Sequence, residues 1–313
     1  MTKKVRGRFA PSPTGEMHLG NAWTALLAWL YVRSNGGTMV LRIEDLDPDR
    51  SRPEYITGLM ADMRWLGLDW DEGPDVGGAY TPYCQDRRRD LYQAALERLA
   101  AERLVYPCYC TRAELAASAP HIGDNIYRYA GTCRNRTDAP ADRRPALRLA
   151  VPEGTIHYED LIYGHYAQEV SRAVGDFVVR RSDGVHAYQL AVVVDDGLMN
   201  INNVVRGADL LDSTPRQLLL YRLLGLTPPT FAHVPLLCGQ DGHRLSKRQR
   251  DLSLAALRRN GVKAEDITGL LAWKAGLIDR RCPVAAADLI NIFALEKLPI
   301  TPIIVENNCF LAE

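Results

Sequence analysis

The chain has 313 residues, 47% hydrophobic and 24% charged, proportions that are ordinary for a globular protein in water. Lysine plus arginine and aspartate plus glutamate each number 38, so the net charge is zero. This charge does not indicate a nucleic-acid-binding protein, nor does it exclude one, because phosphate contacts depend on a local basic surface. No apolar run reaches the roughly 20 residues that span a bilayer, and the basic start from Met1 to Arg8 leads into no secretory signal. We expect a cytoplasmic protein with no membrane partner, and a monomer by default.

The N-terminal region predicts a βαβ unit. Residues 5–10 read as a strand, which the turn-rich stretch 11–15 ends. A helical pattern begins near His18, places apolar residues on one face, and stops at Asn35-Gly36-Gly37. Residues 38–43 read as a second strand. A strand, a helix and a strand in this order imply a parallel sheet.

The rest of the chain gives less regular signals. The apolar run 188–194 fits a buried strand of the parallel sheet, and it ends at Asp195-Asp196-Gly197. The last third, from Thr214, is expected to be mostly helical, with an extended tail from Leu298. The other elements expected are helices at 53–66 and 85–102 and a strand at 177–180.

The run from Arg8 to Asn21 has the features of a phosphate-binding turn. It lies where the first strand meets the first helix, which is where doubly wound sheets bind nucleotides. The helix N-terminus offers backbone N–H groups, and Gly15 and Gly20 allow a ligand close approach. His18 is placed to donate to phosphate oxygens whose charge grows during attack at phosphorus. A surface histidine in a Pro/Gly loop is the alternative.

A second basic loop runs from His243 to Arg248. A lysine on such a loop can follow departing phosphates as a mobile point charge, and Lys247 is the candidate. Arg244 adds a second positive charge. Taken alone, the segment is only a basic loop.

Three of the seven cysteines cluster, at Cys108, Cys110 and Cys133. In a cytoplasmic chain an odd, clustered set favours a metal site over disulfides. Tetrahedral zinc needs a fourth ligand, for which Tyr129 and His121 are the candidates. Buried free thiols are the alternative.

The first motif and its flanks resemble the glutamyl branch of class I aminoacyl-tRNA synthetases. The run from Arg8 to Asn21 is similar to their His-Ile-Gly-His-type motif, with Asn21 in the fourth position, and Leu41 to Asp47 matches the downstream flank. The segment 243–248 is similar to the Lys-Met-Ser-Lys-Ser motif, with Arg244 and Lys247 at the two lysines.

The resemblance implies roles for individual residues. Mg²⁺ would accompany the ATP, and His18 and Lys247 would be the catalytic residues. Arg8 and Arg206 would bind the carboxylates of glutamate and Glu44 its ammonium group. The residues implied for ATP are Pro11, Gly15, His18, Gly20, Asn21 and Lys247. Those implied for L-glutamate are Arg8, Ser12, Glu44, Tyr188 and Arg206.

Two further implications concern the metal and the amino-acid pocket. Short relatives carry Cys-x-Cys followed by Tyr-x-x-x-Cys, which favours one structural zinc ion held by Tyr129 as well as by the three cysteines. Val192 stands where full-length glutamyl enzymes carry asparagine. Losing that side chain should weaken glutamate binding.

We therefore expect an α/β chain, built on a Rossmann-like parallel-sheet nucleotide-binding catalytic domain. An inserted zinc-containing subdomain and a helical C-terminal stem-contact region would complete it. The expected boundaries are 1–104 and 176–235 for the two halves of the catalytic domain, 105–175 for the insert, and 236–313 for the lysine loop and helical region.

Of the 313 residues only 66 follow Lys247, too few for a further anticodon-binding domain. This resembles the short branch of the family, which transfers glutamate to queuosine at the wobble position of tRNA(Asp). The implied partner is the anticodon stem-loop that carries queuosine. Three alternatives stay open: a short synthetase acting on tRNA(Glu), an enzyme passing its adenylate to a small amine or carrier protein, and a non-catalytic RNA-binding paralogue.

Overall fold

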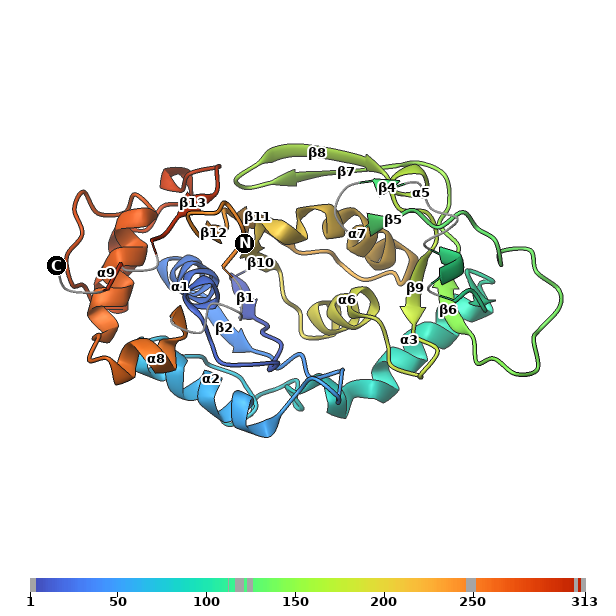
Figure 1. Ribbon diagram of the computed structural model, residues 1–313, viewed down its shortest axis with the longest axis horizontal. Helices are drawn as coiled ribbons and strands as arrows, with labels where there is room; N and C mark the ends of the chain where they lie inside the picture. Colours follow the sequence, from blue (N-terminus) through green and yellow to red (C-terminus); the bar gives the residue numbers. More distant parts are fainter. Residues whose placement is uncertain are drawn as a thin grey trace.

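The computed structural model describes residues 4–111, 113–115, 121–122, 126–245, 252–306 and 309–310. The molecule is elongated, with the N-terminal unit and the C-terminal helices toward one end and a small antiparallel sheet toward the other (Figure 1). No helix formed by the described residues is both long and apolar enough to cross a membrane.

The expected βαβ unit is confirmed. Strand β1 (Arg6–Phe9) and strand β2 (Thr38–Leu41) pair in parallel, and helix α1 (Leu19–Ser34) connects them. Helix α1 is rich in alanine, leucine and tryptophan, and most of its residues are buried. It therefore packs as a core helix at the base of the site.

The main sheet has six strands in the order β2-β1-β10-β11-β7-β8. The first five pair in parallel, and β8 closes the edge as an antiparallel hairpin with β7. Strands β7 and β8 come from the range expected to form the insert, and they lie along one long side of the molecule (Figure 1). Besides β1 and β2, the strands of this sheet are β10 (Asn203–Gly207), β11 (Thr230–Val234), β7 (Thr155–Asp160) and β8 (Gly164–Glu169).

The main sheet separates two hydrophobic cores. On β10, Val204 enters one core and Val205 the other, and on β11 Phe231 and Ala232 divide in the same way. Successive strand residues point to opposite faces, so both faces are covered by apolar side chains. Helix α1 lies on one face, and helices α6 (Tyr188–Leu198) and α7 (Thr214–Leu223) belong to the core on the other.

The run 188–194 was predicted as a strand, and that prediction is wrong. It forms helix α6 (Tyr188–Leu198), whose residues 190–196 are all buried. Residues 190–194 are apolar and buried on every side of the helix, so this part of the run has no polar face and reads like a buried strand. The helix packs against α3 and α7.

A smaller antiparallel sheet joins β3 (Val105–Cys108), β6 (Ala146–Leu149) and β9 (Phe177–Arg180). The strand predicted at 177–180 is therefore confirmed, although it lies outside the main sheet. A short hairpin of β4 (His121–Ile122) and β5 (Ile126–Tyr127) lies in the same part of the chain.

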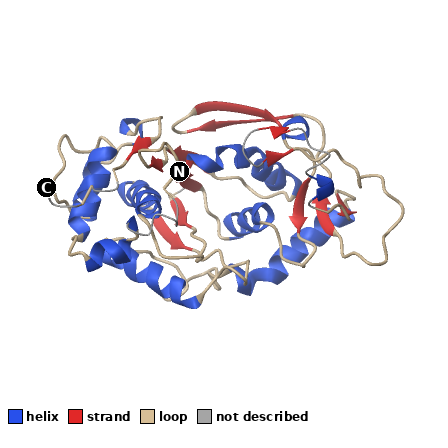
Figure 2. Ribbon diagram, viewed as in Figure 1, coloured by secondary structure: helices blue, strands red, loops and turns tan. Residues whose placement is uncertain are grey.

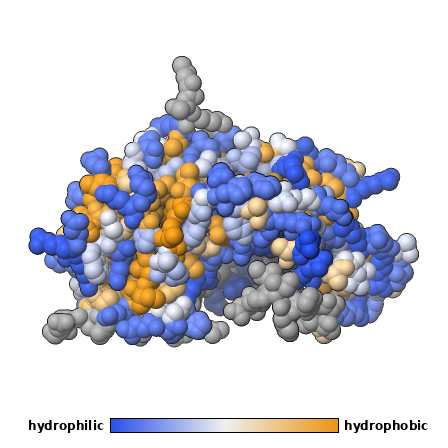
Figure 3. Space-filling model, turned by 90° about the horizontal axis from the view of Figure 1, so that it is seen from above, coloured by the Kyte–Doolittle hydropathy of each residue, from blue (hydrophilic) through white to orange (hydrophobic). Residues whose placement is uncertain are grey.

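The helices expected at 53–66 and 85–102 are confirmed as α2 and as η1 followed by α3. From Thr214 on, helices are the main regular structure but hold fewer than half of the described residues, so the expectation of a mostly helical last third is met only in part. The strands there are β11 and the short pair β12 and β13, the second of which lies in the expected tail. Figure 2 shows the helices flanking the strands, and Figure 3 shows a hydrophilic hollow near the middle of one face. The remaining elements are α2 (Pro53–Trp65), η1 (Gln85–Arg88), α3 (Arg89–Ala101), α5 (Val170–Ala173), η2 (Ala208–Ser213), α7 (Thr214–Leu223), β12 (Leu237–Cys238), α8 (Leu254–Arg259), α9 (Ala264–Lys274), η4 (Ala286–Ile292), η5 (Leu295–Lys297) and β13 (Ile303–Ile304).

Candidate active site

A pocket of about 840 Å³ opens at the carboxyl ends of β1 and β10. This is the edge at which parallel α/β sheets bind ligands. Gly15 is absent from its lining, although its neighbour Thr14 is present, and Lys247 lies outside the described residues. The sequence-predicted residues that line the pocket are Arg8, Pro11, Ser12, His18, Gly20, Asn21, Glu44, Tyr188 and Arg206.

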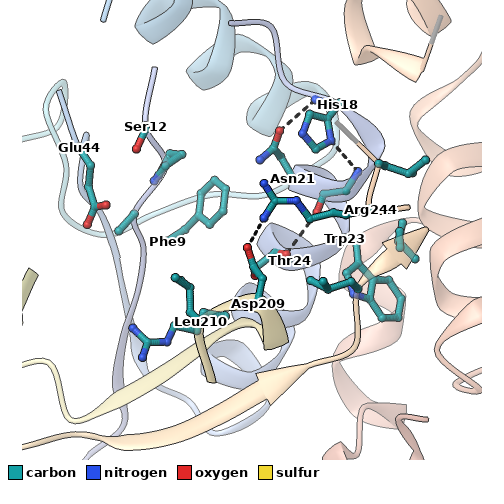
Figure 4. A pocket seen from close by; sticks show the side chains of 18 of the residues that line it. Phe9, Ser12, His18, Asn21, Trp23, Thr24, Glu44, Asp209, Leu210 and Arg244 are labelled. Atoms are coloured by element: carbon teal, nitrogen blue, oxygen red, sulfur yellow. Dashed lines mark hydrogen bonds and ion pairs between the residues drawn. The ribbon is translucent and has the colours of Figure 1, made fainter. Parts of the chain in front are cut away.

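The pocket has two chemically different ends. Figure 4 shows Glu44 and Ser12 on one side and His18, Asn21 and Arg244 on the other. The first side suits an ammonium group, and the second combines a helix N-terminus with an arginine, which suits phosphate.

His18 is the N-cap of α1. Its Nδ1 accepts from the Gly20 N–H at 3.1 Å, and the Asn21 side-chain oxygen accepts from the His18 N–H at 3.2 Å. An added Cβ at Gly20 would lie 3.0 Å from the His18 ring, so a larger residue would crowd the histidine. Asn21 thus closes the helix cap, which gives the asparagine in the fourth motif position a structural task.

Beneath the Glu44 end lies a buried charge network that the sequence analysis missed. The guanidinium of Arg42, which is fully buried, contacts Asp196 at 2.6 Å, Glu44 at 3.2 Å and Asp195 at 3.5 Å. Arg8 contacts both carboxylate oxygens of Asp196 at 3.4 Å. The aspartate pair was visible in the sequence only as the end of an apolar run.

This network sets the electrostatic surroundings of Glu44. Burial lowers the pKa of Arg42, but three carboxylates outweigh that effect and hold its pKa well above the usual value. Burial raises the pKa of Glu44, although Arg42 and Arg8 oppose the rise. Because burial disfavours the ionised form of this carboxylate, a cationic ligand such as an ammonium group would stabilise that form.

Arg206, on β10, is 3% exposed and lines the same pocket. Its Nε donates to His233 Nε2 at 3.1 Å and its Nη2 donates to Thr214 Oγ1 at 2.8 Å. Burial lowers its pKa, and among the described residues it forms no ion pair. It is therefore a buried cation available to an anionic ligand.

Tyr188 begins α6 and lines the pocket beside Arg206. Burial raises the pKa of its phenol, so the hydroxyl stays protonated and available as a donor. Val192, one turn further along the helix, is 1% exposed and packs in the apolar core. It is not a lining residue of the pocket, and its effect on glutamate affinity stays a prediction.

Arg244, at the first lysine position of the second motif, pairs with Asp209 at the pocket wall (Figure 4). The ion pair joins the start of the basic loop to η2, which follows β10. The described part of this loop ends at Leu245, which lines the pocket.

The three clustered cysteines converge. The sulfurs of Cys108, Cys110 and Cys133 all lie within 4.8 Å of one another. The Tyr129 hydroxyl lies 3.4 Å from the Cys108 sulfur and 3.7 Å from that of Cys110. Ligands of tetrahedral zinc stand about 3.8 Å apart when zinc–sulfur bonds are about 2.3 Å, so these four donors fit the ion. Nothing is described of the His121 side chain.

The electrostatics of the cluster favour one thiolate. Burial raises the pKa of Cys133, but hydrogen bonds involving the backbone at Tyr109 and the Tyr129 hydroxyl outweigh it and bring the pKa to about 7. Burial raises the pKa of Tyr129, so without a cation its phenol stays protonated. The Arg148 guanidinium stacks 3.8 Å from the centre of that ring.

The family of tRNA synthetases class I (E and Q), catalytic domain, matches residues 4–277, and the chain belongs to it. Membership places the chain among ligases that use ATP with Mg²⁺, an amino acid and tRNA.

Among its relatives, the chain is similar to two proteins named glutamyl-Q tRNA(Asp) synthetase. The one from Nitratidesulfovibrio vulgaris is 54% identical over 308 residues, spanning 96% of this chain and 95% of that protein. The one from Symbiobacterium thermophilum is also 54% identical, spanning 95% and 94%.

Longer relatives are matched only in part. Glutamate–tRNA ligase 2 of Syntrophus aciditrophicus is 44% identical over 303 residues, which cover 94% of this chain and 62% of the ligase. A crystal structure of a glutamate tRNA ligase from Elizabethkingia meningosepticum in complex with its amino acid aligns with a TM-score of 0.83 at 30% identity, over 98% of this chain and 68% of that one.

Proposed function

We propose that the protein activates glutamate with ATP and transfers the glutamyl group to queuosine at the wobble position of tRNA(Asp). The observation that carries the proposal is the near end-to-end match, at 54% identity, to proteins named glutamyl-Q tRNA(Asp) synthetase. The match to glutamate–tRNA ligase 2, in contrast, covers 62% of that relative.

The pocket supports glutamate as the amino acid. Arg206 is a buried guanidinium with no ion pair among the described residues, which favours a negatively charged ligand. Arg8 lines the same pocket, although it also contacts Asp196. Glu44 supplies the opposite charge for its ammonium group, and Ser12 and Tyr188 add polar contacts. Glutamine would leave a buried guanidinium without its charged partner, which costs more than a neutral hydrogen bond.

In the first step a glutamate carboxylate oxygen attacks the α-phosphorus of ATP, and the bond to the β-phosphate bridging oxygen breaks to release pyrophosphate. His18 and the N-terminus of α1 would stabilise the charge on the phosphates, and Lys247 would follow the departing pyrophosphate. Mg²⁺ would neutralise the phosphate oxygens when bound.

In the second step a hydroxyl of the queuosine cyclopentene diol attacks the acyl carbon, and the bond from that carbon to the bridging oxygen breaks. AMP leaves with this oxygen, which came from the glutamate carboxylate, and the hydroxyl proton is released. No protein nucleophile is required, so positioning carries most of the rate enhancement. The modified base lies in a single-stranded loop, the kind of RNA target that enzymes read.

We propose one structural zinc ion at Cys108, Cys110, Tyr129 and Cys133. The closed set of four donors would pin the fold around the small antiparallel sheet and leave no open position for catalysis. We further propose that the insert at 105–175 meets the RNA, between catalytic halves at 1–104 and 176–235, and that 236–313 forms the lysine loop and the stem-contact region.

The amino-acid half of the proposal is tested by glutamate-dependent exchange between ATP and labelled pyrophosphate. Glutamate should drive exchange, and glutamine and aspartate should drive it at least about a hundredfold less well at equal concentration. Exchange with none of the three would support the non-catalytic alternative, and equal exchange with glutamine would refute the proposed pocket.

A further inference from the structure

Behind Arg206 lies a row of buried side chains that runs away from the pocket. Asp160 ends strand β7, His233 lies on the neighbouring β11, and Arg206 lies on β10 beyond it. The Asp160 carboxylate contacts His233 Nδ1 at 2.6 Å, and His233 Nε2 accepts from Arg206 Nε at 3.1 Å. The exposures are 4% for Asp160, 0% for His233 and 3% for Arg206, so water does not mediate these contacts.

The hydrogen bonds fix which histidine nitrogen carries the proton. Oδ1 of Asp160 already accepts from the backbone N–H groups of Ile162 and Tyr163, each at 3.0 Å. Burial raises the pKa of this carboxyl, but its hydrogen bonds to His233 and to the backbone outweigh the rise and lower the pKa overall. An ionised carboxylate only accepts, so Nδ1 of His233 must donate and Nε2 must be the bare acceptor.

The charge state of His233 agrees with this geometry. Burial lowers its pKa, and the positive charge of Arg206 lowers it further, against the effect of Asp160. The ring is therefore neutral. A protonated Nε2 would point a second N–H at the guanidinium instead of accepting from it.

The guanidinium is consequently held on one side only. His233 takes Nε and Thr214 takes Nη2 at 2.8 Å, while the Phe231 ring lies 4.9 Å from the guanidinium carbon. Nη1 is buried and has no hydrogen-bond partner within the described part of the chain. A buried donor left unpaired is costly unless a ligand completes it.

We infer that His233, oriented by Asp160, is a positioning residue that aims the free Nη1 of Arg206 at a carboxylate of the amino-acid substrate. This inference rests on the proposed glutamate activation. Neither residue lines the pocket, so neither touches the substrate. Their sequence separation of 73 residues explains why no motif contains them.

The sharpest test is Asp160→Asn. The amide oxygen would keep the backbone N–H contacts, which places the amide N–H₂ against His233 Nδ1. The ring proton would then move to Nε2, which lies 3.1 Å from both Thr214 Oγ1 and Arg206 Nε, and Nε2 could no longer accept from the Arg206 Nε–H. We expect KM for glutamate in pyrophosphate exchange to rise about tenfold or more, with KM for ATP changed less than about twofold.

Two substitutions of the histidine separate positioning from packing. His233→Gln can place its amide oxygen near the Nε2 position and still accept from Arg206, whereas His233→Asn reaches only the Nδ1 position. Both remove the buried ring, so both should lower Tm to a similar degree. We expect glutamate KM of the glutamine variant to stay within about threefold of the natural protein and that of the asparagine variant to rise about tenfold.

The outcomes are distinct. A natural protein without glutamate-dependent exchange would overturn the proposed function and this inference with it. An active natural protein whose Asp160→Asn variant keeps its glutamate KM within about twofold would overturn the inference alone. Nitrogen-15 spectra of the histidine ring should report the Nδ1–H tautomer in the natural protein and the Nε2–H tautomer in Asp160→Asn, and an unchanged tautomer would also contradict it.

Discussion

Replacing Arg206 with alanine should remove glutamate activation while leaving the fold intact. His233 and Thr214 take the Nε–H and one Nη2–H, so both Nη1–H groups and the second Nη2–H remain for the substrate. We count the loss of one charge-assisted hydrogen bond, worth about 3 kcal/mol, as the minimum effect. At about 1.4 kcal/mol for each factor of ten, kcat/KM for glutamate should fall by about a hundredfold or more.

The assay is pyrophosphate exchange over a range of glutamate concentrations, with melting temperatures measured alongside. Arg216→Ala is the matched control, because Arg216 is a partly buried arginine of α7 that does not line the pocket. Arg206→Lys keeps the charge but lacks the planar fork, so its loss should be intermediate. Exchange within about threefold of the natural protein in a folded Arg206→Ala variant would refute the pocket assignment.

Three further predictions concern other parts of the chain. Cys133→Ser should reduce bound zinc from about one ion per chain to well below half and lower Tm, measured by elemental analysis and calorimetry, whereas Cys84→Ser should keep the metal. Glu44→Gln should raise KM for glutamate by roughly 30-fold through loss of its ammonium partner, and an unchanged KM would reassign that residue to the buried network. Burial raises the pKa of Asp62 to about 6, against the opposing effect of Arg258. In the unfolded chain this aspartate has its usual lower pKa and loses its proton first, so the free energy of unfolding falls as pH rises from about 4 to 6. Asp62→Asn should therefore raise Tm by about 2 °C at pH 8 and leave it unchanged near pH 4, and equal shifts at both values would contradict the titration.

Local sequence patterns were sufficient to predict those helices and strands whose ends are marked by characteristic residues. The strand at 6–9 ends at prolines, helix α1 ends at Asn35 and Gly36, and β2 is a short apolar segment, so each boundary was predictable to within a few residues. The phosphate-binding turn lies between two such elements. Its position at the carboxyl end of β1 then follows from the parallel connection.

The error at 188–194 has a physical origin. Three consecutive valines favour a strand by local preference, yet the segment is covered by α3, α7 and the small sheet and is buried on all sides. Tertiary packing decides such a segment. The helix places Asp195 and Asp196 where Arg42, Arg8 and Arg88 meet them, an arrangement that a strand would not provide.

Contacts between segments that lie far apart in the chain could not be predicted from the sequence. Arg42 and Asp196 are 154 residues apart, and Asp160 and His233 are 73 apart. Each is an ordinary charged or polar residue in its own stretch of chain. Only the sheet order, which sets β7 beside β11 and β11 beside β10, brings the second pair to Arg206.

The most direct test is to incubate the purified protein with ATP, Mg²⁺ and radiolabelled glutamate in the presence of one of two forms of the same RNA. One is tRNA(Asp) containing queuosine, and the other is the unmodified transcript. We predict label on the first alone, removable by mild base as expected for an ester. Label on the unmodified tRNA, on tRNA(Glu), or on neither RNA while exchange still proceeds would contradict queuosine as the acceptor.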